Sequence, residues 1–495
     1  MNATKRCVGA RVAIALLLSL CACLFFCENN TLLGASIGSD NAMYLTMGTA
    51  LARGYAPYTQ IFDHKGPLLF VLQAIPQLFG GGYQTATVFM MEWLFLTLSL
   101  LTVDAICARL HVKGTLAVQL LYLAVMMPCM DGGNLTEEYA NLFTLPGLWL
   151  ILRVFGDEAK ETRPFFPAMG LGALTVFAFL TRANNALPLL GAVFGVTLFL
   201  VIDKRFKTLF TCASGFLVGS VLAFIPILLW LASRGAVGAA FYASITHNLM
   251  YAQTGDSSRV AMLFHSGYGH MAMLMAALAS LGALCAAIRT RRLAVAMAMF
   301  FGALGAGAAA FISHKFYTHY LMIGAPMAAL GAAQILSLIS VKKASALHAG
   351  KIALAFACVV SLLISGCASN TRRMSDRTGI EQFAHNAQTL YAQVPEEDRD
   401  SFMAYRVESK WYVFTEALPC MRFYFLQETL GQADPRVMDE IVETFEKDPP
   451  RWLVIYYNRP FSPPYDERVQ AIIDSRYAFV DARGEYQLLR LTDQD

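Results

Sequence analysis

Charged side chains are scarce in this chain. Asp, Glu, Lys and Arg make up 15% of its 495 residues, whereas 56% are hydrophobic. About a quarter of the residues of a soluble domain are charged. The composition therefore excludes an ordinary soluble enzyme and predicts a polytopic α-helical membrane protein. We expect membrane lipids among its partners and no nucleic acid.

Cysteine motifs are also missing. Most of the 11 cysteines lie in apolar stretches, and none forms a C-x-x-C pair or a Cys/His spacing typical of zinc. The sequence thus predicts neither a disulfide framework nor a structural zinc site. It also lacks the internal repeat that marks many transporters.

Long apolar stretches are abundant, and a membrane span needs about 20 such residues. The first stretch follows Lys5, Arg6 and Arg11 and lacks a small-residue cleavage site, which predicts a retained anchor. We expect eleven spans, near 8–27, 86–108, 115–130, 139–155, 165–181, 184–202, 209–231, 262–288, 293–312, 319–340 and 351–367.

The positions of Lys and Arg predict the orientation. Before residue 368, 17 of 23 such residues fall in alternate segments that share a side with the N-terminus. Because cations accumulate in cytoplasmic loops, the N-terminus should be cytoplasmic and the first outer loop, 28–85, extracytoplasmic.

The end of the chain differs in charge. Residues 368–495 hold 22 acidic and 15 basic residues, a net charge of −7, whereas residues 1–367 have a net charge of +10. We expect a membrane domain over 1–367 and a small extracytoplasmic α/β domain over 368–495. Its expected elements are helices at 379–393 and 435–447 and strands at 452–456, 477–480 and 486–489.

The first outer loop carries a polar stretch with its own apolar face. Tyr44, Met47 and Leu51 have helical spacing, which predicts a helix that starts near Ser39 and lies along the bilayer surface. The pattern breaks at Gly54-Tyr55-Ala56-Pro57-Tyr58 and resumes after Gly66-Pro67.

Three cations on the expected outer side need an explanation, because the positive-inside bias disfavours them. They are Lys65, Arg182 and Lys315, and each could bind an anionic head group. The alternative is that each extends to the interface or pairs with a nearby acid. Their polar neighbours complete the candidate binding set: Tyr44, Asp63, His64, Asn184, His314, His319 and Tyr320.

Asp40 is the candidate general base, since a carboxylate in reach of an acceptor hydroxyl can remove its proton. Its alternative role is a helix N-cap. Glu137 and Glu138 could supply a second catalytic acid, although the helix dipole also favours acids at a helix start. Glu92, within the second span, is a weaker candidate that could bond to a neighbouring helix.

These residues resemble a known family. Asp40, Tyr44, the Gly-Tyr-x-Pro-Tyr run and Lys65-Gly66-Pro67-Leu68 are similar to the first outer loop of GT-C glycosyltransferases. The nearest branch comprises the bacterial relatives of protein O-mannosyltransferases and the lipid A aminoarabinose transferase. The resemblance implies that Asp40 is the base and that Lys65 contacts the lipid phosphate.

The resemblance extends to later loops. It makes Glu137 or Glu138 the match to a second loop acid, and Arg182 with Asn184 the match to a polar pair. Two family glutamates are replaced here, by Asn41 and His64. This departure puts a carboxylate-bound divalent cation in doubt, although Asp63 could substitute.

The resulting hypothesis is an inverting glycosyltransferase on the outer face of a bacterial cytoplasmic membrane. It would move a sugar from a polyprenyl-phosphate-linked donor to an envelope glycan, lipid or protein. The alternatives are a transporter or flippase for lipid-linked sugars and a non-catalytic assembly protein that keeps the fold. Polar residues concentrated in outer loops, not at mid-membrane, favour the enzyme.

Overall fold

The structure is a computed structural model. It describes residues 3–30, 37–80, 83–156, 163–254, 258–264, 267–288, 292–313, 315, 317–339, 344–456 and 466–492. The chain forms two compact units, which we call the helical unit and the mixed unit. The helical unit comprises Met1–Asn30, Phe89–Leu229 and Asp256–Thr371, and the mixed unit comprises Thr31–Val88, Trp230–Gly255 and Arg372–Asp495.

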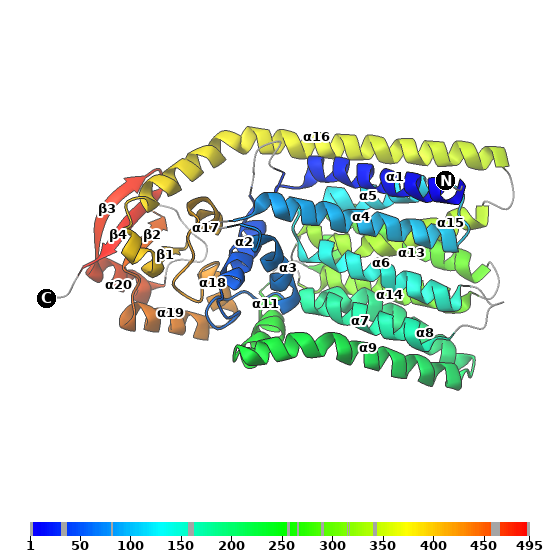
Figure 1. Cartoon of the computed structure of the whole chain (residues 1–495), viewed down its shortest axis with the longest axis horizontal. Helices are drawn as coiled ribbons and strands as arrows, with labels where there is room; N and C mark the ends of the chain where they lie inside the picture. Colours follow the sequence, from blue (N-terminus) through cyan, green and yellow to red (C-terminus); the bar gives the residue numbers. More distant parts are fainter. Residues whose placement is uncertain are drawn as a thin grey trace. The chain divides into compact units, whose positions relative to one another are not determined.

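The helical unit is built from long apolar helices whose axes run roughly alongside one another (Figure 1). Its main helices are α1 (Ala3–Phe26), α4 (Thr85–Arg109), α5 (Thr115–Met126), α6 (Thr136–Phe155), α7 (Phe165–Thr181), α8 (Leu187–Ile202), α9 (Phe206–Ser233), α13 (Tyr268–Ile288), α14 (Leu293–Phe311), α15 (Ala325–Ile339) and α16 (Ala344–Tyr391). Its short elements are η1 (Met127–Cys129), η2 (Ala183–Ala186), α12 (Arg259–Phe264) and η4 (Thr318–Gly324).

Helices overlap all eleven expected spans, although the expected span 262–288 falls on both α12 and α13, and the expected span 319–340 begins in η4 and continues in α15. In the part of the chain that the structure describes, eight helices are long and apolar enough to cross a membrane. The predicted class, a polytopic α-helical membrane protein with a small α/β domain, is therefore confirmed. The helix that contains the last expected span, α16, continues beyond residue 367 to Tyr391.

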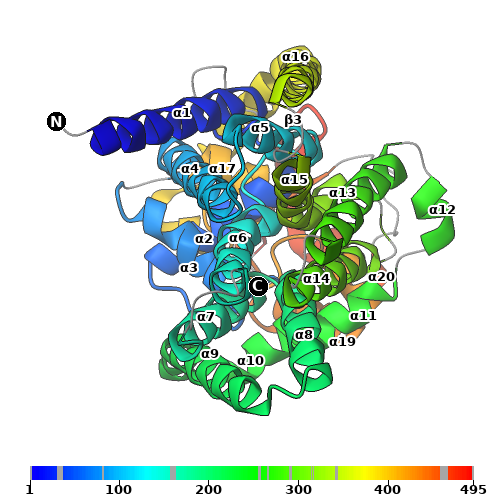
Figure 2. The same cartoon turned by 90° about the vertical axis from the view of Figure 1, so that its right-hand side faces the viewer.

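Small residues let the helices of this unit approach closely. Helix α8 packs against α14, and α13 packs against α15 (Figure 2). A side chain at Gly191 or Gly195 of α8 would collide with backbone carbonyls of Phe301 and Met297 in α14. Such close contacts are typical of membrane helices, which gain little from hydrophobic burial against each other.

The mixed unit begins with α2 (Ser39–Ala52) and α3 (Pro67–Gln77). Helix α2 ends just before Gly54, and Pro67 occupies the start of α3, as the turn residues predicted. The sequence predicted one apolar face on α2, but residues 41–50 are buried on every side. They are enclosed because α3 and α17 (Lys410–Thr415) both pack against α2.

A four-stranded sheet forms the rest of this unit, in the order β1-β2-β4-β3. Strand β1 (Phe402–Tyr405) pairs in parallel with β2 (Trp452–Tyr456), and β4 (Tyr486–Leu491) pairs antiparallel with both β2 and β3 (Tyr477–Arg483). The remaining elements are α10 (Val237–Phe241), the π-helix η3 (Tyr242–His247), α11 (Asn248–Ala252), η5 (Glu396–Ser401), α18 (Gln427–Ala433), α19 (Arg436–Lys447) and α20 (Glu467–Arg476).

Helices cover both faces of the sheet beside β1. Side chains alternate between faces along a strand. Phe402 meets Tyr391 of α16 at 4.9 Å between ring centroids, and Tyr405 meets Phe445 of α19 at 5.4 Å on the other face. Within the mixed unit, Arg372–Asp495 pack with Thr31–Val88 and Trp230–Gly255.

Candidate functional site

Asp40 lies in the first turn of α2, where the helix dipole favours a negative charge. The N-cap of α2 is Gly38, so the alternative role of Asp40 as the N-cap is wrong. The carboxylate is half-buried, and within the described ranges no hydrogen bond or ion pair holds it. Tyr44 lies one turn further along the same face of the helix. An unpaired carboxylate at such a position is suited to accept a proton.

Lys65 connects this face of α2 to the loop before α3. Its Nζ lies 5.6 Å from the centre of the Tyr44 ring, within range of a cation–π interaction. The same Nζ is 3.2 Å from Nε2 of His64 and 3.6 Å from Oδ1 of Asp63. The predicted group of Tyr44, Asp63, His64 and Lys65 is thus one cluster in the structure.

The loop carrying this cluster is folded tightly. Oδ1 of Asp63 accepts a hydrogen bond from the backbone N–H of Lys65 at 2.9 Å, as in an Asx turn. Oδ2 of Asp63 lies 3.5 Å from Nδ1 of His64. All three side chains are at least nine-tenths buried, so Asp63 is the counter-ion that makes burial of the Lys65 ammonium tolerable.

Sequence reasoning missed the segment that supports this loop from outside. Asn248 donates from Nδ2 to the carbonyl of His64 at 2.5 Å, and Ser244 donates to the carbonyl of Lys65 at 3.2 Å. The His64 ring lies 4.9 Å from that of Tyr251. These residues belong to η3 and α11, and π-helical turns occur frequently at functional sites. The only sequence signal is the spacing of four between His247 and Tyr251.

His247 is buried in the same cluster. Its ring is 5.9 Å from that of His64 and 5.7 Å from that of Phe62. Burial lowers the pKa of His247, so this imidazole is neutral at pH 7.

A second candidate cluster lies within the helical unit, around Arg182. This residue has an extended backbone at the break between α7 and η2, which keeps these two predicted spans apart. One terminal nitrogen of Arg182 lies 2.9 Å from Oε1 of Glu137, and the other donates to the Tyr320 hydroxyl at 3.0 Å. The guanidinium carbon is 4.4 Å from the centre of the Tyr320 ring.

Aromatic rings extend this cluster. The His319 ring is perpendicular to that of Tyr320 at 4.7 Å, and Tyr317 stacks on His319 at 5.6 Å. Arg182, Glu137, Tyr320 and His319 are all buried. Because Glu137 is engaged by the guanidinium, its geometry fits the counter-ion of Arg182 better than a general base.

Glu138 points elsewhere. The backbone N–H of Asn134 donates to Glu138 at 3.0 Å and to Glu92 at 2.7 Å. The other oxygen of Glu92 accepts from the Asn29 amide at 3.0 Å. Two buried carboxyl groups that converge on one N–H would repel each other strongly if both were ionised. This group holds the turn that precedes α6.

Three predicted site residues have not yet been described. Asn184 donates to the carbonyl of Ala309 at 3.3 Å, and it is Asn185 that reaches Thr136 and Thr181 beside Arg182. Lys315 is half-buried in the segment before η4, and His314 lies outside the described residues. Within the described ranges, no three His, Cys, Asp or Glu side chains are placed to hold a metal ion together.

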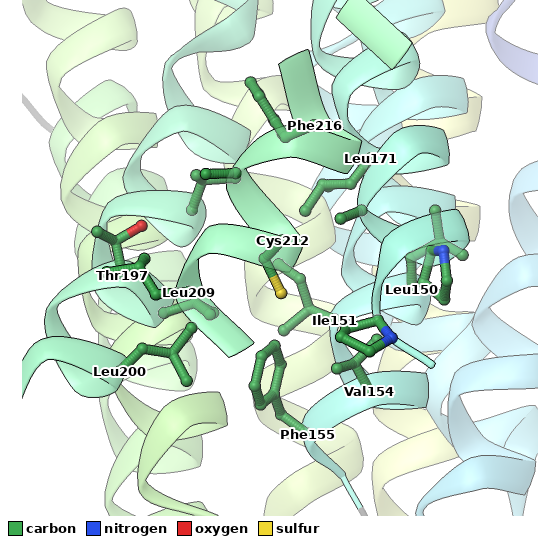
Figure 3. Close-up of a pocket in the computed structure, with 16 residues that line it drawn as sticks. Leu150, Ile151, Val154, Phe155, Leu171, Thr197, Leu200, Leu209, Cys212 and Phe216 are labelled. Carbon is green, nitrogen blue, oxygen red and sulfur yellow. The ribbon is translucent and has the colours of Figure 1, made fainter. Parts of the chain in front are cut away.

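Among its described residues, the helical unit contains at least two apolar cavities. One, of about 480 Å³, is lined by small and flexible side chains of α13 and α14 and by Leu321, the neighbour of Tyr320. The other, of about 210 Å³, lies among α6, α7, α8 and α9, and Cys212 points its sulfur into it (Figure 3). The side chains that line the two cavities carry no charge.

Comparison with known proteins identifies the fold. No family model matches the sequence, and no curated protein matches it. Among solved structures, ArnT from Cupriavidus metallidurans bound to undecaprenyl phosphate is similar with a TM-score of 0.62 and 14% identity. The match covers 99% of this chain and 98% of that chain.

Two transferases share the same arrangement of helices. The archaeal oligosaccharyltransferase AglB from Archaeoglobus fulgidus, in complex with an inhibitory peptide and a dolichol-phosphate, gives a TM-score of 0.58 at 12% identity, over 92% of this chain and 70% of that chain. The arabinofuranosyltransferase AftD from Mycobacteria gives 0.51 at 13%, over 99% and 40%. These matches show the GT-C fold, as the resemblance of the loop motifs predicted.

Proposed function

We propose that this protein is an inverting glycosyltransferase that moves a sugar from a polyprenyl-phosphate-linked donor to a cell-envelope acceptor. One observation carries the proposal. Asp40 is a half-buried carboxylate without a partner in the described part of the chain, and it lies one helical turn from Tyr44, whose ring contacts the Lys65 ammonium. A free base near a buried cation is what transfer from a phosphate-linked sugar requires.

The reaction follows from these two charges. Asp40 accepts the proton of the acceptor hydroxyl as its oxygen attacks the anomeric carbon of the donor sugar. The bond between that carbon and the phosphate oxygen breaks, and its electron pair leaves with the lipid phosphate. A single displacement of this kind inverts the anomeric configuration.

Fixed cations stabilise the negative charge that develops on the leaving phosphate. Lys65 is the ammonium proposed for this role in the mixed unit. Arg182, held by Glu137 and Tyr320, is the guanidinium proposed for it in the helical unit, since its planar fork suits phosphate oxygens. His64, His319 and Tyr320 add hydrogen-bonding and aromatic surface. Glu137 then acts as a positioning residue, and Glu138 supports the turn before α6.

The lipid part of the donor is supported by two further observations. The structures bound to undecaprenyl phosphate and dolichol-phosphate share this fold. The larger apolar cavity, beside Leu321, is lined by alanine, glycine, leucine, methionine and phenylalanine, which suit a branched hydrocarbon chain. The acceptor is an envelope glycan, lipid or protein, and we place the reaction on the outer face of a bacterial cytoplasmic membrane.

The test is release of polyprenyl phosphate by the purified full chain. The donors would be polyprenyl-phosphate-linked hexoses and pentoses, with a cell-envelope fraction as acceptor. Asp40→Asn would be compared with Asp376→Asn, which changes an exposed carboxylate of α16, and donor binding would be measured for each protein.

We expect release by the wild type and by Asp376→Asn, and none by Asp40→Asn, although all three bind donor. Equal release by Asp40→Asn would remove Asp40 from the mechanism. If all three proteins bind donor but none releases polyprenyl phosphate, the proposal of a glycosyltransferase that uses these acceptors is contradicted. Movement of the donor across the membrane of proteoliposomes that contain the protein would then support the alternative function, a transporter for lipid-linked sugars.

A further inference from the structure

The segment 409–424 of the mixed unit contacts the backbone of α2 at two points that bracket Asp40. The Ser409 hydroxyl donates to the carbonyl of Ser39 at 2.7 Å, and the Tyr424 hydroxyl donates to the carbonyl of Met43 at 3.0 Å. Ser409 and Tyr424 are fully buried. Because Ser39 and Met43 are one turn apart, the two bonds fix both the position and the rotation of the first turn of α2.

The Ser409 hydroxyl does not form the hydrogen bond that is usual for a serine at its position. Ser409 is the N-cap residue of α17, where a serine hydroxyl usually accepts a hydrogen bond from its own helix. Here that cap bond is absent, and the hydroxyl donates to a carbonyl 370 positions away in sequence. The start of α2 has no side-chain cap of its own either, since Gly38 occupies that position.

The same segment holds the loop that leads to Lys65. Arg422 donates from Nε to the carbonyl of Tyr58 at 2.7 Å, and the backbone N–H of Phe62 donates to the carbonyl of Arg422 at 2.9 Å. The Arg422 guanidinium lies 5.2 Å from the Phe62 ring centre and forms two hydrogen bonds to Glu440, at 3.0 and 2.8 Å. Four bonds from one segment therefore reach α2 and the loop.

We infer that segment 409–424 is a positioning element: its hydrogen bonds set Asp40 and Lys65 in the relative geometry that transfer needs. The inference rests on the function proposed above and assigns a role to the C-terminal part of the chain. Ser409 and Tyr424 act through Asp40 and do not touch the substrate. Misplacing a reacting group by about 1 Å can cost about 100-fold in rate, so loosening α2 should reduce turnover.

The experiment uses Ser409→Ala, Tyr424→Phe and the double variant of the full chain. Each single change deletes one hydroxyl and leaves the surrounding packing nearly unchanged. The matched control is Tyr477→Phe, which deletes a tyrosine hydroxyl that donates to the carbonyl of Pro450 at 2.8 Å, within Arg372–Asp495. The readouts are kcat, donor affinity and the temperature of unfolding.

We expect kcat to fall about 10-fold in each single variant and about 100-fold in the double variant. The donor Kd should stay within about twofold of the wild type, because the substitutions affect the placement of the base in the transition state and not the binding of the donor in the ground state. Tyr477→Phe should keep the wild-type kcat. If Tyr477→Phe lowers kcat in proportion to a lowered unfolding temperature, the loss of activity is a general stability effect. This result would overturn the inference.

The outcomes separate the two proposals. If the wild type does not release polyprenyl phosphate, or Asp40→Asn retains full turnover, the proposed function or its base is wrong. If Asp40→Asn is inactive while Ser409→Ala and Tyr424→Phe both keep the wild-type kcat, only the positioning role is wrong.

Discussion

Asp40 in the mixed unit and three glutamates in the helical unit have different environments. In the mixed unit, Asp40 is half-buried and carries no hydrogen bond or ion pair within the described ranges. In the helical unit, Glu137 pairs with Arg182, and Glu92 and Glu138 share the N–H of Asn134. All three of these glutamates are buried. By sequence alone, all four acids were candidates for catalysis or for a helix contact.

The buried carboxylates are less available as a base than the half-buried Asp40. A buried carboxylate is stable only when a cation or hydrogen-bond donors compensate its lost hydration, and those same partners reduce its availability as a base. Asp40 instead gains its stabilisation from the dipole at the start of α2, which leaves its oxygens open to an acceptor. The unpaired acid is therefore the one that substitution should affect through chemistry, and the paired acids should act through structure.

The largest expected effect is on Asp40. Asp40→Asn keeps the size of the side chain but removes its basicity, so we expect kcat to fall about 10²–10⁴-fold, the usual contribution of a general base. Stability should change little, because the carboxylate has no partner to lose in the described structure. Turnover and the unfolding temperature would be measured on the same preparation. A large loss of stability would show that Asp40 is a structural acid like the others.

Arg182 provides the second comparison. Arg182→Met leaves Glu137 buried without its cation, so we expect unfolding to become easier by about 3–5 kcal/mol. Adding Glu137→Gln removes the uncompensated charge and should restore most of that stability. Donor binding should be lost in both variants, because neither has the guanidinium. Denaturation in detergent and donor titration would measure these effects, and recovery of donor binding in the double variant would exclude Arg182 as a phosphate ligand.

Local sequence signals predicted much of this molecule. Apolar length predicted the helices of the helical unit, and Gly54, Pro57 and Pro67 predicted where α2 ends and α3 begins. Strand β1, which has only four residues, was missed, whereas the longer apolar run Trp452–Tyr456 was predicted and forms β2. Tyr44, Asp63, His64 and Lys65 were candidates as polar residues of the first outer loop, and the structure brings them together.

Long-range contacts could not be predicted in this way. Glu137 and Glu138 are adjacent in sequence, but side chains on a helix point about 100° apart from one residue to the next. Only the packing of α6 determines which of them meets Arg182. Ser244 and Asn248 lie about 180 residues after the loop of His64 and Lys65 and donate hydrogen bonds to its carbonyls. Such hydrogen bonds leave no pattern in the sequence.

A smaller effect is expected for Glu428, a half-buried acid of the mixed unit that pairs with Arg406 at 2.9 Å. Burial raises the pKa of Glu428 to about 7, although Arg406 opposes the shift. The folded protein then binds this proton more tightly than the unfolded chain, whose pKa is near 4.5. The stabilisation is complete below pH 4.5 and is lost as the pH rises through 7, by at most about 3 kcal/mol. Thermal unfolding between pH 4.5 and 8 would measure it, and Glu428→Gln should flatten the curve.

The smallest effect should come from Glu138. If Glu138 and Glu92 share one proton, replacing the protonated carboxyl by its neutral isostere costs little stability. At least one of the variants Glu138→Gln and Glu92→Gln should therefore change the free energy of unfolding by less than about 1 kcal/mol. Both should retain turnover, in contrast to Asp40→Asn. Glu138→Ala, which also removes the acceptor for the N–H of Asn134, should cost about 2–3 kcal/mol. Turnover and unfolding of the three variants would be compared. Loss of turnover in Glu138→Gln at unchanged stability would make Glu138 a second catalytic acid and end the distinction between paired and unpaired carboxylates.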